Sequence, residues 1–428
     1  MQLPQDHPRR LELNDEVHAR PPEALSVPSR LSYLALFCDA AQRDQSWSMV
    51  CDLARQFDRP LPLPGSLHYS ADFGAFRLKW ERHTEFVRYQ IIVAGDGGDP
   101  FAQPAILAAP ADWIAALPGQ VLVAAHVALL RSDAPPDEFD IISARDFNGN
   151  TLVGAAIGGV AATALTDFHV HADGFSRIVL LDRAMTSRQA GRMVQRLLEI
   201  DTYRMMALLA LPISRDLAPV LTRAEQELAK ITAALVKASS RDEALLLERL
   251  TKIEAEIDSR ESANHYRFSA SAAYYELVQR RIADLREVRI EGIQRFQEFT
   301  ERRLAPAMNT LRAVAARQAS LSERLARAVQ LLSTRVDIAR EQQNQKVLES
   351  MNRRAKLQLR LQQTVEGLSI AAITYYVVGL VGYGAKGAKA AGLRIDPDLA
   401  IAASIPVVAL LAAYGVHRIR RLVSRAGD

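Results

Sequence analysis

Two apolar stretches decide the architecture of this chain: LSIAAITYYVVGLVGYGA at Leu368–Ala385 and LAIAASIPVVALLAAYGV at Leu399–Val416. Neither contains a charged side chain. A helix rises about 1.5 Å per residue and the hydrocarbon core of a bilayer is about 30 Å thick, so each stretch is close to the length that crosses it. The alternative is a pair of buried helices in a soluble domain, because this length is near the lower limit for spanning. We predict a two-helix transmembrane hairpin over residues 367–417.

Cationic side chains on both outer flanks favour the membrane over the soluble alternative. They are Arg353, Arg354, Lys356 and Arg360 before the first stretch, and His417, Arg418, Arg420, Arg421 and Arg425 after the second. Cytoplasmic flanks of membrane helices are rich in Lys and Arg, so we expect a multi-pass protein of the inner membrane with both termini in the cytoplasm. Lys386, Lys389 and Arg394 in the connecting loop weaken this contrast. Residues 418–428 form a basic cytoplasmic tail, which makes membrane lipid an expected partner.

Small side chains in both stretches suit close contact between helices. Gly379, Gly382 and Gly384 lie in the first stretch, and Ala and Ser occur in both. Helix association in lipid depends on such small residues. We therefore expect a homo-oligomer assembled through the helices. In a channel, the first stretch would line the pore with Tyr376, Gly379 and Tyr383.

The composition describes an ordered protein of two or three domains. The chain has 428 residues, 49% hydrophobic and 24% charged, with a net charge of +4. We expect no nucleic-acid partner, since this charge is modest and part of it lies near the predicted membrane. Cys38 and Cys51 show no metal-site spacing, which favours a reducing compartment. The first residues, MQLPQDHPRRLELNDEVHARP, hold no apolar core, so we expect no secretory signal.

Residues 1–186 have the pattern of an N-terminal mixed α/β cytoplasmic domain. Strand-like segments occur at Leu31–Phe37, Phe76–Trp80, Glu85–Val93 and Gln120–Leu130, with helical segments around Ser46–Phe57 and Pro110–Leu117. Two hairpins are expected after Thr151. The first, TLVGAAIGGVAATAL, turns at Gly158 and Gly159, and the second, FHVHADGFSRIVLL, turns at Asp173 and Gly174.

Residues 187–366 have the pattern of a helical stalk or coiled coil. Ser187 can cap a helix that ends at Pro212, a second helix covers about residues 216–237, and a third begins near Arg241. Beyond Asn264, apolar residues keep an approximate helical stripe: Leu311, Val314, Leu321, Leu325, Leu332, Val336, Val347 and Met351. The predicted fold class is therefore α+β, with the N-terminal domain, this stalk and the C-terminal hairpin.

The histidines of FHVHADG are the most suggestive candidates for a metal site. In a strand, His169 and His171 would face the same side and meet one divalent or transition-metal cation, with Asp173 adding an oxygen ligand. The alternative, which we favour, is that both histidines line the exposed face of a hairpin.

Two further polar segments have a functional and a structural interpretation. In the N-terminal arm, His7, Arg9, Glu16, His18 and Arg20 could bind an anionic ligand, or the arm could dock on the first domain by salt bridges, which we favour. In WERHTEF, Glu81, Arg82, His83 and Glu85 could pair an acid with a base, but alternating charges on a solvated strand explain them equally well, and we favour that interpretation.

The helix after Ser187 carries polar residues at helical spacing: Arg192, Arg196, Glu199 and Tyr203. Glu199 can pair with Arg196, and we interpret the helix as a core-packing element with structural ion pairs. The chain contains no nucleophile elbow, Walker sequence, dinucleotide fingerprint or zinc-protease motif. We therefore expect no enzyme, and the cofactor, if there is one, is unknown.

Several motifs in sequence order resemble a bacterial family of membrane-anchored proteins, the domain of unknown function 3422. They are HPRRLELNDEVHARP, FRLKWERHTEF, FHVHADGFSR and RLLEIDTYRMMALLALP, followed by a helical region and the terminal apolar pair. The resemblance covers nearly the whole chain. It implies a location at the bacterial inner membrane. It does not imply any particular activity, because that family has no assigned reaction.

The order of parts is also similar to CorA-type magnesium channels, which have a mixed N-terminal domain, long helices and two C-terminal membrane helices. Those channels carry Gly-Met-Asn at the end of the first membrane helix, where this chain reads GYGAKG at Gly382–Gly387, so ion selectivity is in doubt. Function has to be argued from a site rather than from shared architecture. We expect a membrane-anchored scaffold or regulatory, ligand-binding module; the alternative is an oligomeric cation channel or transporter.

Overall fold

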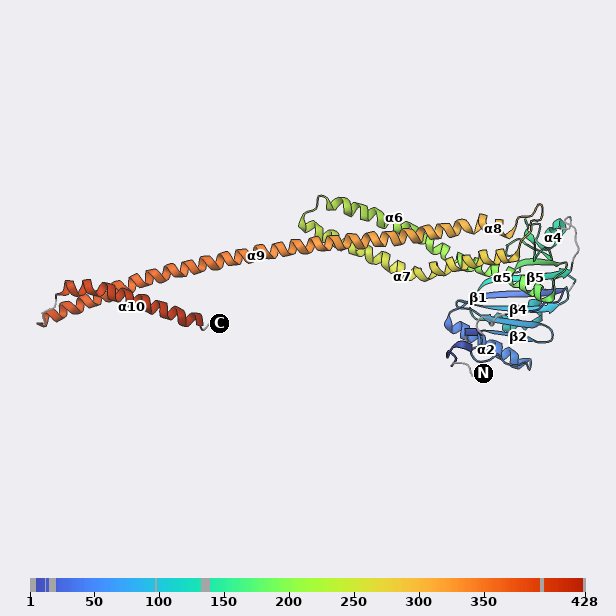
Figure 1. Cartoon of the computed structure of the whole chain (residues 1–428), viewed down its shortest axis with the longest axis horizontal. Coiled ribbons are helices and arrows are strands. Elements are labelled where there is room, and N and C mark those ends of the chain that lie inside the picture. Colours follow the sequence, from blue (N-terminus) through green and yellow to red (C-terminus); the bar gives the residue numbers. More distant parts are fainter. Residues whose placement is uncertain are drawn as a thin grey trace. The chain divides into compact units, whose positions relative to one another are not determined.

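Eight strands form a single sheet in the order β2-β3-β4-β1-β5-β8-β7-β6 (Figure 1). The strands are β1 (Ser29–Phe37), β2 (His68–Asp72), β3 (Arg77–Arg82), β4 (Phe86–Ala94), β5 (Gln120–Arg131), β6 (Val153–Ile157), β7 (Ala162–Thr166) and β8 (Ser176–Asp182). Neighbouring strands are antiparallel except for β5 and β8, which are parallel. The computed structural model describes residues 5–11, 13–14, 21–96, 98–131, 139–392 and 396–425, without the side chains of residues 240, 241 and 419–425.

Helices interrupt and follow the strands of the sheet in the chain. They are α2 (Ala40–Gln56), the 3-10 helix η1 (Ala105–Ala108), α3 (Ala111–Ala115), α4 (Phe139–Asp146), α5 (Ser187–Leu208), α6 (Ala210–Leu235), α7 (Ser240–Leu285), α8 (Phe296–Arg303), α9 (Ala305–Ala390) and α10 (Pro397–Arg425). The α+β class predicted from the sequence is confirmed. The chain divides into two compact units, residues 1–237 with 248–329 and residues 238–247 with 330–428.

In the first unit, helices cover both faces of the sheet. One face packs on α5, the C-terminal part of α7, α8 and the start of α9. On the other face, α2, η1 and α3 cover β1 to β4, and α4 covers β5, β7 and β8. Strand alternation produces this division, because successive side chains of a strand point to opposite faces.

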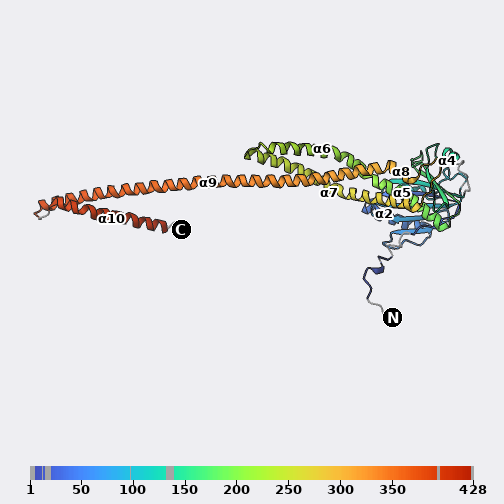
Figure 2. The same cartoon turned by 45° about the horizontal axis from the view of Figure 1, so that its top comes forward.

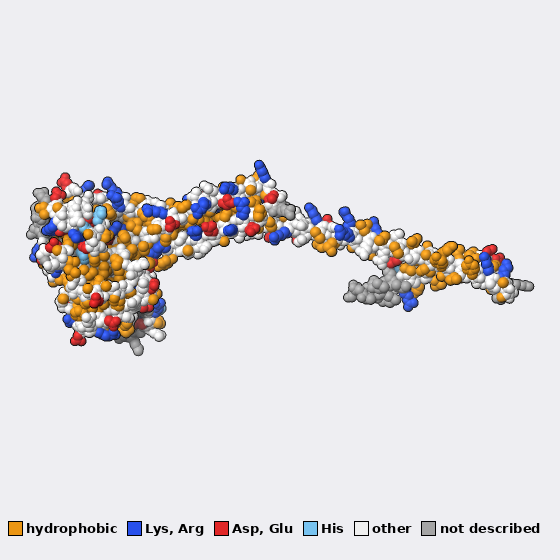
Figure 3. All heavy atoms as spheres, turned by 180° about the vertical axis from the view of Figure 1, so that it is seen from behind, with side chains coloured by type: hydrophobic (Ala, Val, Ile, Leu, Met, Phe, Trp, Pro, Cys, Tyr) orange, Lys and Arg blue, Asp and Glu red, His pale blue; other side chains and the backbone are white. Residues whose placement is uncertain are grey.

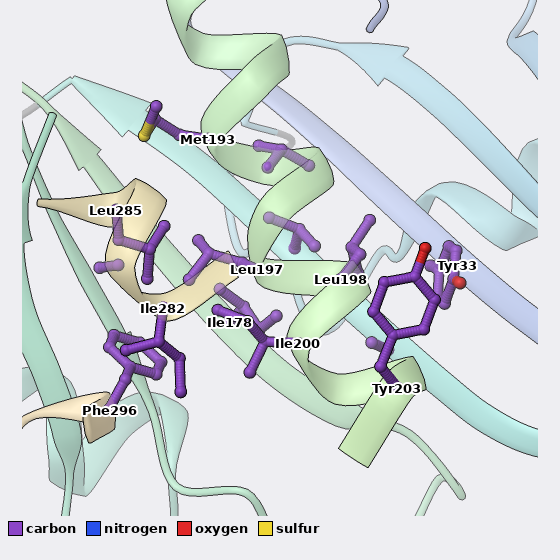
Figure 4. Close-up of a cluster of buried hydrophobic side chains, with 14 of the residues drawn as sticks. Tyr33, Ile178, Met193, Leu197, Leu198, Ile200, Tyr203, Ile282, Leu285 and Phe296 are labelled. Carbon is purple, nitrogen blue, oxygen red and sulfur yellow. The ribbon is translucent and has the colours of Figure 1, made fainter. Parts of the chain in front are cut away.

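The core beneath α5 joins the sheet to the helices that follow it. Leu197, Leu198 and Ile200 of α5 are buried against Ile178 of β8, and Ile282 of α7 belongs to the same cluster (Figure 4). The boundary predicted at residue 186 therefore does not separate two cores. Apolar residues on one stripe of α5 are buried by the sheet, so this helix completes the N-terminal domain.

The chain just before β1 is pressed against α5. Leu25 N donates to Ser187 O at 3.0 Å, and a Cβ on Gly191 would lie 1.6 Å from Glu23 O. Only glycine permits this approach of two backbones. The segment that follows the arm, from residue 21 onward, therefore docks on the first domain. Docking of the arm itself stays a prediction, since its described residues are exposed and Glu16, His18 and Arg20 lie outside the described residues.

The sequence-based strands at 31–37, 76–80, 85–93 and 120–130 are confirmed as β1, β3, β4 and β5, and the turn at Gly158 and Gly159 as the β6–β7 hairpin. The second predicted hairpin is wrong in its first arm. Residues 167–175 form a loop, since Asp167 Oδ1 accepts a hydrogen bond from His169 N at 3.1 Å and the chain turns there. Phe168 adopts a left-handed φ of 54° at this turn.

Helix limits differ from the sequence pattern at the prolines. Pro212 does not end the helix that begins at Ser187: α5 ends at Leu208, and Pro212 lies in the first turn of α6, where an amide hydrogen has no intrahelical acceptor. Pro219 also lies inside α6. Long helices are nevertheless confirmed, and α6, α7 and the first part of α9 lie side by side in the first unit (Figure 2). Arg317 of α9 pairs there with Glu225 of α6.

In the second unit, α10 folds back along the end of α9. Gly382 of α9 is close to Ile401 of α10: a Cβ added to Gly382 would lie 3.0 Å from Ile401 Cδ1. In the same unit, Arg335 Nη2 of α9 lies 2.5 Å from Glu243 Oε1 of α7.

Both α9 and α10 are long and apolar enough to cross a membrane, and so is the α5–α6 stretch Ser187–Leu235. In the last case the apolar stripe of α5 is already buried by the sheet.

Candidate functional site

Five charged side chains lie between one face of the sheet and helices α5 and α7. We call them the ionic network: Lys79 and Glu81 of β3, Arg88 of β4, Glu199 of α5 and Arg281 of α7. Lys79 and Glu81 alternate with Leu78 and Trp80, which point into the core on the other face. Glu81 is opposite Arg88 in the β3–β4 register.

Arg88 lies at the centre of the ionic network. Its Nε donates to Glu81 Oε2, and its Nη1 lies 3.4 Å from Glu199 Oε1. Lys79 Nζ lies 3.1 Å from the other oxygen of Glu81 and donates to Pro21 O at 2.7 Å. Arg281 Nε donates to Glu199 Oε2. Each of the two carboxylates therefore has two cationic partners, as a buried carboxylate requires.

Burial and charge act in opposite directions on these groups. Burial alone would raise the pKa of Glu81, but Arg88 and Lys79 outweigh it and hold the pKa below its usual value. For Arg88, burial would lower the pKa, and the nearby Glu81 raises it instead. Burial lowers the pKa of Lys79, against the attraction of Glu81. Arg88 and Lys79 thus favour the charged form of Glu81, whose side chain is 0% exposed. A group without solvent access joins elements rather than reacting with a substrate.

The ionic network continues along α7 to the surface. Arg281 Nη1 donates to Asp284 Oδ2 at 3.3 Å, and Arg196 Nη1 donates to Asp284 O at 3.1 Å. The predicted pair of Glu199 with Arg196 is therefore wrong. Glu199 is turned toward the sheet, where Arg88 attracts it, whereas Arg196 contacts the end of α7.

The charges of WERHTEF belong to separate contacts. Glu85 pairs with Arg267 of α7, and both side chains are largely buried. Arg82 Nη1 lies 2.7 Å from Asp44 Oδ1, while the ring of His83 stacks on a phenylalanine. The interpretation as a solvated strand is wrong for Glu81 and Glu85, because α5 and α7 cover this face. Glu81 and Glu85 pair with cations outside the motif, Arg88 and Arg267.

The histidines predicted to share a metal ion lie in the loop between β7 and β8. The side chain of His169 is 67% exposed, whereas that of His171 is 2% exposed, with Nε2 3.0 Å from Asp167 Oδ2. Asp173 Oδ2 instead lies 3.6 Å from Arg177 Nη2. His169 Nδ1 lies 3.8 Å from the same Asp167 oxygen, so both imidazoles are near Asp167 and not near the predicted ligand Asp173. Among the described residues, no three His, Cys, Asp or Glu side chains are placed to hold a metal ion.

The remaining predicted site residues belong to the N-terminal arm and to the predicted pore. In the arm, Arg9 N donates to His7 Nδ1 at 3.2 Å, an exposed local contact, and the other three arm residues fall outside the described part of the chain. On α9, Tyr376 and Tyr383 are exposed, and no atom lies within 4 Å of the position of a Cβ on Gly379. These three positions are on the apolar surface of the second unit.

A buried histidine on β5 had no signal in the sequence beyond its place in an apolar strand. His126 Nδ1 lies 2.9 Å from Ser32 Oγ, and its ring stacks on Phe175 with centroids 3.9 Å apart. Ser32 Oγ accepts a hydrogen bond from Ile106 N at 2.9 Å, which leaves the hydroxyl hydrogen for His126. Burial lowers the pKa of His126 to about 4, so the ring is neutral.

Comparison with protein-family models matches residues 5–423 to the model described as "Protein of unknown function (DUF3422)". This confirms the family predicted from the motifs; it says nothing of CorA-type channels. No curated protein and no solved structure matches the chain.

Replacing Arg88 with methionine is expected to lower the free energy of unfolding by about 3–5 kcal/mol, because Glu81 and Glu199 would keep their charges while losing their central partner. Urea unfolding of the full chain in detergent, followed by tryptophan fluorescence, measures the change. Arg327→Met is the control, since the Arg327–Glu323 pair is exposed and worth about 0–1 kcal/mol. Equal effects of the two substitutions would contradict a structural role for the ionic network.

The free energy of unfolding is expected to fall as the pH is lowered from about 6.5 toward about 4, by up to about 1.4 kcal/mol per pH unit from His126. In this range His126 of the unfolded chain binds a proton, whereas the buried ring of the folded chain stays neutral. Acid therefore favours unfolding. Unfolding curves at a series of pH values test this. His126→Gln should flatten the dependence, and an unchanged slope in that variant would rule out His126 as its source.

Proposed function

The chain belongs to the DUF3422 family of proteins of unknown function, and we propose that it is a membrane-tethered protein whose N-terminal α+β unit acts as a regulatory, ligand-binding module. One observation supports membrane attachment through α9 and α10, which we call the tether. Large apolar side chains of α9 and α10 are exposed: Leu368, Ile373, Tyr375, Tyr376, Val377, Leu380, Val381, Tyr383, Leu399, Ile405, Val407, Leu410, Leu411 and Tyr414. Figure 3 shows such hydrophobic side chains along the α9–α10 pair.

Exposure of this apolar surface to water is unfavourable in free energy. Burial of apolar area is worth about 25 cal/mol per Å², and soluble monomers rarely leave contiguous patches larger than a few hundred Å² exposed. The hydrocarbon core of a bilayer removes the cost, and a helix satisfies its own backbone hydrogen bonds there. In α10 none of the most apolar window is buried by the rest of the protein, which supports lipid as its surroundings.

The fold-back of α10 supports a two-pass topology. Two antiparallel spanning helices return the chain to the side from which it came, and Arg353, Arg354 and Arg360 precede the first apolar stretch. By the preference of basic flanks for the cytoplasm, we place both termini on the cytoplasmic side of the inner membrane.

A second copy of the chain is part of the proposal. No atom lies within 4 Å of the position of a Cβ on Gly379, Gly384 or Gly387, so a helix from another copy could approach the α9 backbone closely. Packing of small residues is the main source of helix association in lipid, where the hydrophobic effect no longer acts.

Membrane retention tests the tether. Wild-type protein should stay with the membranes through an alkaline carbonate wash, whereas Leu410→Arg with Leu411→Arg should release part of it, because each arginine costs about 2.5–3.5 kcal/mol near the centre of a spanning helix. Immunoblots of pellet and supernatant give the distribution.

Leu331→Arg is the matched control. Leu331 is exposed on α9 outside the apolar stretches, so this arginine should leave retention unchanged. Release of folded wild-type protein by carbonate without detergent would overturn the tether.

A further inference from the structure

A pocket opens in the first unit where the β6–β7 turn, α5 and the end of α7 meet. Its volume is about 270 Å³, and its polar lining comes from Gln189, Arg192 and Arg196 of α5 and from Asp284 and Arg286 at the end of α7. Met193 provides apolar wall. We call this the arginine pocket.

Backbone contacts fix the walls of the arginine pocket. Gly158 N of the β6–β7 turn donates to Leu285 O at 2.9 Å, and Val288 N donates to Ala156 O at 2.8 Å. The end of α7 is therefore tied to the sheet. Arg286 has a left-handed φ of 51°, which ends α7 at the rim of the pocket. The pocket is thus built by segments far apart in the sequence and held together by main-chain hydrogen bonds.

The arginine pocket has more positive than negative charge. Three guanidinium groups line it together with one carboxylate, that of Asp284. Arg281 already donates to this carboxylate from outside the pocket, so Asp284 is compensated. Within the described residues, neither Arg192 nor Arg286 has a hydrogen bond or ion pair through its side chain. Arg196 Nε lies 3.9 Å from Asp284 Oδ2, at the limit of an ion pair.

Unpaired guanidinium groups in a concave site match the chemistry of phosphate. Arginine presents a planar set of N–H donors that binds phosphate oxygens in pairs, and its charge persists at every physiological pH. The volume is slightly below that of typical pockets for drug-sized ligands, about 300–1,000 Å³, which favours a small molecule over a macromolecule. The side chain of Met193 can contact a small apolar part of that molecule.

We propose that the arginine pocket binds a small phosphate-bearing ligand through Arg192, Arg196 and Arg286. The inference rests on the ligand-binding part of the proposed function and not on the tether, since every residue involved belongs to the first unit. Arg196 and Asp284 also connect the pocket to Arg281 and so to the ionic network, which makes the ligand a stabiliser of the joint between sheet and helices.

Isothermal titration of the detergent-solubilised full chain with pyrophosphate tests the proposal. Arg192→Gln and Arg286→Gln should each weaken binding about tenfold, and the double variant about a hundredfold, as expected for lost charged hydrogen bonds. Both side chains are on the surface, so circular dichroism melting should show an unchanged fold. Arg188→Gln is the matched control, an exposed arginine of α5 outside the pocket that should leave affinity unchanged.

A second arm separates free phosphate from a lipid headgroup. The same variants are reconstituted into nanodiscs of phosphatidylcholine with or without phosphatidic acid, and thermal stability is measured. Stabilisation by phosphatidic acid that the double variant abolishes assigns the phosphate to a lipid; pyrophosphate binding that the double variant abolishes assigns it to a soluble ligand. If neither probe acts on the wild type, or both act equally on wild type and double variant, the proposal is overturned. Carbonate retention is measured independently, so failure of the tether is distinguished from failure of the pocket.

Discussion

The exposed apolar surface of α9 and α10 is the constraint on which the account of this protein depends. The sheet and its helices bury most of their apolar side chains against one another, in clusters on both faces of the sheet. The last two helices do not. Side chains such as Leu380 and Leu410 are at least 70% exposed, and only lipid or other apolar helices can remove them from water.

Within the first unit, the ionic network joins the sheet to the helices through buried ion pairs, where apolar contacts usually do so. Arg88 and Glu199 are buried where hydrophobic residues would pack at lower desolvation cost, so their value lies in precise orientation rather than in stability. They join strands β3 and β4 to α5 and α7, and Arg281 and Asp284 extend the contacts to the rim of the arginine pocket. A ligand bound at the rim, as we propose, would therefore be linked to the sheet interior through ion pairs of α7. This linkage is the physical basis for our proposal that the unit is regulatory.

The sequence predicts the secondary structure of this protein better than its sites, for reasons visible in particular residues. Apolar, β-branched and aromatic content located β1, β4 and β5, and the Gly158–Gly159 turn located the β6–β7 hairpin, because these signals are local. The loop at His169 escaped prediction because a side chain of Asp167, not a turn motif, redirects the backbone. The partner of Glu199 could not be read from helical spacing either, since it comes from Arg88, over a hundred residues earlier in the chain. Arg192 was noted in the sequence, but its meeting with Arg286 depends on how α7 returns to the sheet.

The depth of α10 in a bilayer tests the central claim most directly. Cys38 and Cys51 are buried, so a spin label can be directed to a cysteine placed at Leu410, and to one at Leu331 for comparison, in the full chain reconstituted in vesicles. Collision with oxygen reports hydrocarbon, and collision with a water-soluble nickel chelate reports water. The account predicts that the label at Leu410 collides with oxygen and is shielded from nickel, with the opposite result at Leu331. Equal access of the nickel chelate to both positions would contradict it.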